Sequence, residues 1–225
     1  VNGNALNNAP EAFVSLAAEE ASLFIPKIEL GEDKFVNKFQ HLFNVPKNLL
    51  LKGYISNLLL NLNDTFQFRA DFEDLSLKSN EFSISGLGGV LQNTSDITRL
   101  KINTPYLRMA LGSLFDSDLI FNNLSSELDI NLIDNKLFIS NSTFKASYKK
   151  TAINGEINLY PSPFDDTGDL SLKITSNDLD YLDALSLFPN FSYTKLTKSW
   201  LQNSISCGSF QEFTFIYRGP IDNKY

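Results

Sequence analysis

Apolar and polar residues alternate almost one by one through the second half of the chain. From Leu124 to Ile174 the apolar positions recur every second residue, and short turn signals such as Asp134-Asn135 separate the segments. Successive side chains of a β-strand point to opposite faces, so a period of two is typical of strands with one apolar face. The pattern predicts an antiparallel β-meander with an apolar side and a polar side.

The same alternation occurs earlier in the chain. It predicts strands over Tyr54–Leu62, Thr65–Phe72, Ile84–Leu91 and Ile97–Ile102, the last ending before Pro105. The three glycines of the Ile84–Leu91 segment indicate a bulge or a close backbone approach, because no Lys-Ser/Thr pair or following helix completes a phosphate loop. Across these strands and the meander, one apolar set is expected to share a face: Phe66, Phe68, Phe72, Leu128, Ile130, Leu132, Leu137, Ile139, Phe144, Tyr148, Ile157, Leu159, Leu170, Leu172 and Ile174.

Helical spacing interrupts the strand pattern in two places. Between Glu32 and Pro46 the apolar residues fall on one stripe of an amphipathic helix, whereas Ala12–Leu30 favours an extended segment. Near the other end, a short helix is expected around Leu179–Leu185, and a second from Thr194. Leu196, Trp200, Leu201 and Ile205 form the stripe of the second helix, with Gly208 as its C-terminal cap and Trp200 and Leu201 fastening it to the sheet.

These elements predict one folding unit. Residues 1–10 have no period and read as a flexible lead-in. Residues 11–225 form a single mainly β segment of a longer protein, divided into a strand plus helix (11–50), a β-meander (52–176) and a helix pair with a return strand (177–225).

Composition excludes several function classes. The net charge of −7 argues against a nucleic-acid partner, which needs clustered Lys and Arg. The single cysteine, Cys207, forms no internal disulfide, and the single histidine, His41, has no neighbouring Cys or His for a metal site. The aspartates at 165, 166, 178 and 180 match no calcium loop and read as turn residues. No catalytic constellation is found, so we expect neither an enzyme nor a cofactor.

The C-terminal part of the sequence resembles a known family. Tyr181, Pro189, the pair Trp200-Leu201, Gly208 and the run from Arg218 through Gly219 and Pro220 to Asp222 are similar to a stretch of the AsmA-like envelope proteins of Gram-negative bacteria, in the branch of YhdP. The resemblance extends upstream through a Pro-Lys-x-x-Leu-x-x-Gly segment at 46–53 and a Phe-Glu-Asp-Leu-Ser-Leu segment at 72–77.

The resemblance implies a fold and a role. Its fold is an antiparallel meander curved into an open, taco-like groove, with short amphipathic helices packed on it or at its ends. Its role is lipid transport in outer-membrane homeostasis: the periplasmic part of an inner-membrane-anchored protein carries phospholipid acyl chains along the groove. The expected partners are phospholipid, the rest of the same long chain and other envelope proteins, and the apolar set named above becomes the groove lining.

Two alternatives stay open at this point. The apolar face is equally that of an ordinary core, which would fit a non-catalytic structural or protein-interaction module of the cell envelope. The choice of inward residues also depends on strand register, because a slip of one residue moves every side chain to the other face.

Overall fold

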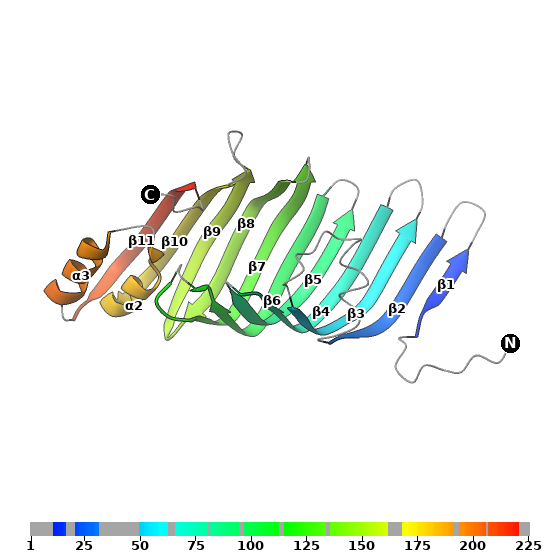
Figure 1. Cartoon of the computed structure of the whole chain (residues 1–225), viewed down its shortest axis with the longest axis horizontal. Helices are drawn as coiled ribbons and strands as arrows, with labels where there is room; N and C mark the ends of the chain where they lie inside the picture. The colour runs from blue at the N-terminus through cyan, green and yellow to red at the C-terminus, as the bar shows by residue number, and fades with distance from the viewer. Residues whose placement is uncertain are drawn as a thin grey trace.

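The computed structural model shows a single antiparallel sheet with two short helices near its C-terminal end (Figure 1). It describes residues 11–16, 21–31, 50–62, 66–80, 82–94, 97–112, 115–133, 136–161, 168–190, 194–205 and 207–220. The strands are β1 (Phe13–Leu16), β2 (Ala21–Leu30), β3 (Leu50–Leu62), β4 (Phe66–Lys78), β5 (Ser83–Thr94), β6 (Ile97–Ala110), β7 (Leu119–Ile133), β8 (Lys136–Tyr148), β9 (Thr151–Pro161), β10 (Gly168–Asp180) and β11 (Ser209–Pro220). The helices are α2 (Tyr181–Ser186) and α3 (Lys195–Ser204).

Each strand pairs with the next one along the chain, in the order β1 to β11. No pairing joins β1 to β11 among the described residues, so the sheet is a curved meander and not a closed barrel. The predicted fold class, mainly β with an antiparallel meander and short helices at its end, is confirmed. The predicted strand character of Ala12–Leu30 is confirmed as well, since β1 and β2 occupy it.

The strands bend along a line that crosses the sheet (Figure 1). Four strand residues have positive φ at points where the strand pairing shifts register. They are Gly53 on β3, Asp74 on β4, Gly86 on β5 and Asn123 on β7. Gly, Asn and Asp tolerate this left-handed conformation, and bulges of this kind increase the local bend of a strand. The short polar or glycine residues inside these strands therefore give the sheet its curvature.

The prediction that a strand ends before Pro105 is wrong. β6 continues to Ala110, and Pro105 lies where β5 and β6 are out of register between Ser85 and Gly89. Proline has no amide hydrogen and is tolerated in a sheet where the ladder is already interrupted. The hydroxyl of Thr104 supports this point by donating to the carbonyl oxygens of Gly86 and Tyr106.

Helix α2 lies against one edge of the sheet and closes a hydrophobic core there. Asp180 caps it by accepting a hydrogen bond from the amide of Leu182. The buried residues of this core come from the strands, from α2 and from the segment after it: Leu107, Leu119, Leu124, Ala146, Tyr148, Ile153, Ile174, Leu179, Ala184, Leu187 and Phe213.

Helix α3 corrects two predictions. Its C-terminal cap is Ile205 and not Gly208, whose carbonyl oxygen instead accepts a hydrogen bond from the amide of Tyr181. Trp200 does not fasten the helix to the sheet, because its side chain is exposed, whereas Leu201 is half-buried. The side of the helix that carries Leu201 faces the rest of the molecule, and Trp200, about 100° away around the helix, faces outward.

Several predictions concern parts of the chain outside the described residues. These are the lead-in at 1–10, the helix within 32–46 with His41, the turn at 134–135 and the aspartates at 165 and 166.

Candidate functional site

One face of the sheet carries a continuous row of mostly apolar residues across ten strands. We call this face the inner face, and we call the row that follows the central row. Strand register aligns its members from β2 to β11 as Ile28, Ile55, Phe72, Gly89, Ile102, Ser126, Phe144, Gly155, Ile174 and Phe215. Paired strands lie about 4.8 Å apart, so the row extends over roughly 43 Å.

A second row runs parallel to the central row on the same face. Its aligned members are Leu23, Leu60, Phe68, Asn93, Thr98, Ile130, Ile139, Leu159, Leu170 and Gly219. Leu128, Ile157 and Leu172 lie on the same face between the two rows, and the Cα pair Leu132 and Leu137 continues it beyond the second row. With Phe66, which pairs with Leu62, and Tyr148, which pairs with Phe121, the register places thirteen of the fifteen predicted lining residues on one face, and the side chains of Leu132 and Leu137 lie outside the described residues.

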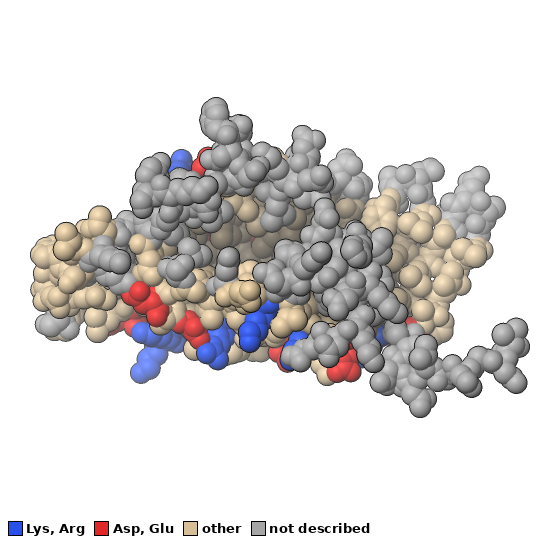
Figure 2. All heavy atoms as spheres, in the orientation of Figure 1, with Lys and Arg blue, Asp and Glu red and all other residues tan. Residues whose placement is uncertain are grey.

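The inner face is apolar but only partly covered. Along the second row Phe68, Ile130, Ile139, Leu159 and Leu170 are half-buried, in contrast to the fully buried residues beside α2. Figure 2 shows a hollow above the central strands, in which no charged side chain is visible, and Lys, Arg, Asp and Glu side chains that gather mainly below it. The inner face is therefore an apolar trough that is closed along one edge.

Two phenylalanine rings lie flat on the floor of the trough. Phe72 pairs with Gly89 and Phe144 with Gly155, and a Cβ atom built on either glycine would lie 2.9 Å or 2.3 Å from the ring of its partner. An aromatic ring that covers a glycine of the neighbouring strand stabilises the pair. In these two pairs the ring lies along the floor over a glycine, so neither residue projects into the trough.

Few polar groups interrupt the inner face, and most of them bond within the sheet. The side-chain amide of Asn93 donates to Thr98 Oγ1 over 3.2 Å, and Ser126 Oγ donates to the carbonyl oxygen of Thr143. Asn93 Oδ1 and Ser142 Oγ are buried without a hydrogen-bond partner among the described atoms. The floor of the trough thus offers little competition to an apolar ligand.

The edge of the trough beside α2 is closed by polar and aromatic contacts. The hydroxyl groups of Tyr148 and Ser186 lie 2.7 Å apart, and the Lys149 ammonium donates to the Asp183 carboxylate, which raises the pKa of the lysine. Beyond α2, the ring of Phe188 packs 4.9 Å from that of Phe215 at the end of the central row. Further from α2, between the two rows, burial raises the pKa of the Tyr217 hydroxyl on β11.

The opposite face, the outer face, carries charged residues in cross-strand pairs. Arg99 contacts both Glu127 and Asp129, and Lys101 also contacts Glu127, while Lys173 pairs with Glu156 two strands further on. The pairs made by Glu127 and Glu156 are exposed and contribute little stability singly, whereas Asp129 is buried, and all of them keep this face polar.

Two equivalent polar clusters mark bulges on the outer face. In each, an asparagine with positive φ donates to an aspartate on the neighbouring strand, and the aspartate also pairs with an arginine. One cluster consists of Asn57, Asp71 and Arg69, and the other consists of Asn141, Asp129 and Arg99. The Asn side chains hold the bulges in place from the polar side.

We expect Asp129→Asn to destabilise the sheet in a pH-dependent way. Hydrogen bonds from Arg99 Nε, at 2.8 Å, and from Asn141 Nδ2, at 3.1 Å, lower the pKa of Asp129 below 3.8, against the opposing effect of burial. A carboxylate with a lowered folded-state pKa stabilises the protein above its unfolded pKa, and this contribution is lost as the pH falls through the folded-state value.

Urea denaturation at pH 7 should show a loss of about 1–2 kcal/mol for the variant. At a pH well below 3.8 the difference from wild type should vanish. Glu127→Gln is the matched control, because the Glu127 side chain is 47% exposed and its loss should have little effect. An equal loss at both pH values would show that the carboxylate charge is not responsible.

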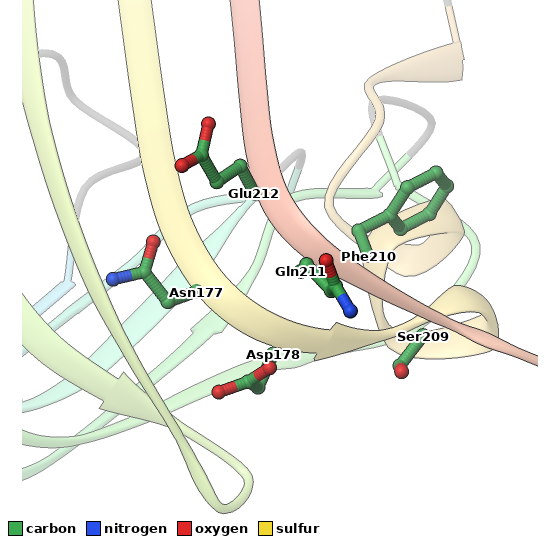
Figure 3. A pocket seen from close by; sticks show the side chains of 6 residues that line it. All are labelled: Asn177, Asp178, Ser209, Phe210, Gln211 and Glu212. Carbon is green, nitrogen blue, oxygen red and sulfur yellow. The ribbon is translucent and has the colours of Figure 1, made fainter.

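An open pocket of about 700 Å³ lies where β10 and β11 curve together (Figure 3). It is lined by Asn177 and Asp178 of β10 and by Ser209 to Glu212 of β11. Its only ionisable lining residues are the two carboxylates, and the backbone of Asp178 has positive φ. The pocket is a consequence of the bend and provides neither a base nor a nucleophile in a defined geometry.

Clusters of metal-ligating side chains and membrane-spanning helices were sought in the described part of the chain. No group of three or more His, Cys, Asp or Glu residues comes together there in a way that could hold a metal ion. Cys207 is exposed. No described helix is long and apolar enough to cross a membrane.

The remaining motif residues have structural positions. Arg218 is exposed on β11, and Gly219 lies at the end of the second row, next to the ring of Tyr217. The side chain of Pro220 lies outside the described residues.

Sequence reasoning missed part of the inner face. Leu60, Leu91, Leu100 and Ile102 also belong to it, as their Cα partners show. Their alternation was present in the sequence, but the glycines of β5 and Pro105 of β6 obscured its continuity with the meander.

Comparison of the chain with family models, with curated proteins and with solved structures finds no match.

Proposed function

We propose that the inner face binds the acyl chains of phospholipids and lets them move along the sheet. The observation that supports this most directly is the apolar face itself, which is continuous across ten strands and half-buried over the second row. Soluble proteins seldom leave an apolar patch of this extent in water unless it binds something. A trough open along one edge would allow the polar headgroup to stay in water.

The energetics are adequate for reversible binding. Each methylene removed from water contributes roughly 0.8 kcal/mol, so a chain of about sixteen carbons that is half covered gains on the order of 6 kcal/mol. Rows of equivalent side chains on successive strands provide many similar positions. An acyl chain could therefore shift from one position to the next with small changes in free energy.

The proposed cellular role follows the resemblance to AsmA-like proteins. In this proposal the chain is a periplasmic segment of an inner-membrane-anchored protein that carries phospholipid between the inner and outer membranes of a Gram-negative bacterium. The role needs no catalytic residue and no cofactor. Its partners would be phospholipid, the rest of the same chain and other envelope proteins.

A charge placed on the trough floor should abolish lipid binding. We expect the variant Phe68→Asp, Ile130→Asp to lose about 90% or more of the phospholipid that copurifies with the wild-type protein, because an apolar chain cannot compensate for burying two carboxylates. Lipid is measured by native mass spectrometry and by extraction of protein purified from bacterial membranes. Circular dichroism checks that the variant keeps its strand content.

The matched control places the same charges on the other face. Gln67→Asp, Asn131→Asp changes the sequence neighbours, whose side chains point to the outer face, and should keep the lipid. If wild-type protein is free of lipid and takes up no labelled phospholipid, the alternative of a structural or protein-interaction module is favoured.

A further inference from the structure

The second row of the inner face carries polar side chains at one point. Eight of its ten aligned positions are Leu, Ile, Phe or Gly, and the other two are Asn93 on β5 and Thr98 on β6. Asn93 and Thr98 are direct cross-strand partners, so their side chains lie next to each other on the inner face. We call these two residues the polar pair. The polar pair interrupts the apolar row between Phe68 and Ile130.

The wall of the trough is lower at the polar pair than at the neighbouring hairpins. β5 extends one residue past Asn93, and β6 begins one residue before Thr98. β3 and β4 extend two residues beyond the row, and β7 and β8 extend three residues beyond Ile130 and Ile139. At about 3.4 Å per residue, the wall made by β7 and β8 is roughly 7 Å higher. These strand ends lie opposite the edge that α2 closes, because α2 follows the other end of β10.

The polar pair has hydrogen-bonding capacity that the sheet does not use. The side-chain amide of Asn93 donates to Thr98 Oγ1 over 3.2 Å, but Asn93 Oδ1 is buried and accepts no hydrogen bond among the described atoms. The hydroxyl proton of Thr98 likewise meets no acceptor among the described residues. Ser126, the polar residue of the central row, differs because its hydroxyl bonds to the carbonyl oxygen of Thr143. A buried acceptor without a donor is unfavourable, so its presence on a binding surface points to a ligand that supplies the donor.

We propose that Asn93 and Thr98 form a subsite for a phospholipid headgroup that donates hydrogen bonds. This inference rests on the proposed function, since it concerns the lipid held by the inner face. An ammonium or hydroxyl group of the headgroup donates to Asn93 Oδ1, and the Thr98 hydroxyl donates to a phosphate or ester oxygen of the same lipid. The lower wall leaves the headgroup in contact with water while the acyl chains lie on the apolar residues of the two rows.

The chemistry of the subsite distinguishes between headgroups. Phosphatidylethanolamine has an ammonium group and phosphatidylglycerol has hydroxyl groups, and both can donate to Asn93 Oδ1. The trimethylammonium group of phosphatidylcholine has no N–H or O–H donor. The subsite should therefore select against phosphatidylcholine when the acyl chains are identical.

Competition among these three lipids tests the subsite. Lipid-free protein is mixed with equal amounts of the three lipids, all with the same acyl chains, and the bound species are measured by native mass spectrometry. Wild-type protein should bind phosphatidylethanolamine or phosphatidylglycerol about three- to tenfold more tightly than phosphatidylcholine, as expected for one net hydrogen bond. The lipid with the stronger preference identifies the donor.

A double variant should remove the preference and keep the binding. Asn93→Leu, Thr98→Val makes the second row apolar throughout, so it should bind all three lipids alike and phosphatidylcholine at least as tightly as wild type does. Both new side chains suit a strand, and circular dichroism checks that the variant is folded. Gln92→Leu is the matched control, because Gln92 pairs with Arg69 on the outer face and its replacement should leave the preference unchanged.

Two results would overturn the subsite alone. The first is equal binding of the three lipids by wild-type protein, and the second is a preference that persists in the double variant. Either result leaves acyl-chain binding by the trough in place. Wild-type protein that binds none of the three lipids would overturn the proposed function and the subsite together, so the two failures are distinguishable.

Discussion

Gly155→Val should unfold the sheet or reduce its free energy of unfolding by more than about 3 kcal/mol. A Cβ atom at Gly155 would lie 2.3 Å from the ring of Phe144 and 2.5 Å from the carbonyl oxygen of Lys173. The ring could move, but the carbonyl belongs to the paired strand β10 and cannot move without breaking the ladder. Because φ at Gly155 is outside the left-handed region, the expected loss comes from the lack of space.

A double-mutant cycle separates the two contacts. Thermal and urea unfolding of Gly155→Ala, Phe144→Leu and the double variant should show partial rescue, since the smaller side chain removes the ring contact and leaves the carbonyl contact. Gly31→Ala is the control, because nothing lies within 4 Å of a Cβ at that position. A Gly155→Ala protein as stable as this control would contradict the flat packing of Phe144 over the glycine.

Leu179→Ala should reduce the free energy of unfolding by about 3 kcal/mol or more. Leu179 has no exposed surface and packs with Ile153, Ala184 and Leu187 where the end of β10 leads into α2. Truncation leaves a cavity at the junction that holds α2 against the sheet. The loss should therefore combine the transfer of the side chain with the unfilled space.

The neighbouring Leu182 provides the matched control. It lies on α2 but is 53% exposed, so Leu182→Ala should change the stability by no more than about 0.5 kcal/mol. Hydrogen exchange adds a local measurement: amide protection in α2 should fall in the Leu179 variant before that of β7 and β8. Equal stability of both variants would contradict the assignment of the core to this edge.

The strand pattern was predictable because each strand has one polar face and one apolar face. Alternation alone placed Phe66 and Phe68, and Leu170 and Leu172, on the correct common faces, and antiparallel hairpins brought these faces together. The bulges did not disturb this result. Each bulge lies between two groups of residues, and within each group the alternation gives the common face correctly. The residues of β9 and β10 show this most clearly, since they alternate without interruption from Ile157 to Leu159 and from Leu170 to Ile174.

Other features depend on contacts that the sequence does not encode locally. Pro105 normally marks a strand end, and here the register shift between β5 and β6 accommodates it. The apolar stripe of α3 predicted that the helix packs on a neighbour, but the sequence does not say which side of the stripe meets it. In the structure Leu201 is partly covered by the rest of the molecule and Trp200 is not. The Asn–Asp–Arg clusters likewise join residues from different strands, so no local sequence pattern predicts them.

The central row receives one residue from each of the ten strands β2 to β11, and this gives the trough a modular geometry. A hairpin inserted or deleted in register would change its length by about 10 Å and leave its cross-section, its floor and its polar outer face unchanged. The number of hairpins thus sets the length of the trough, while the glycine and asparagine bulges set its depth. Length and profile of the trough can therefore vary independently in evolution and in design.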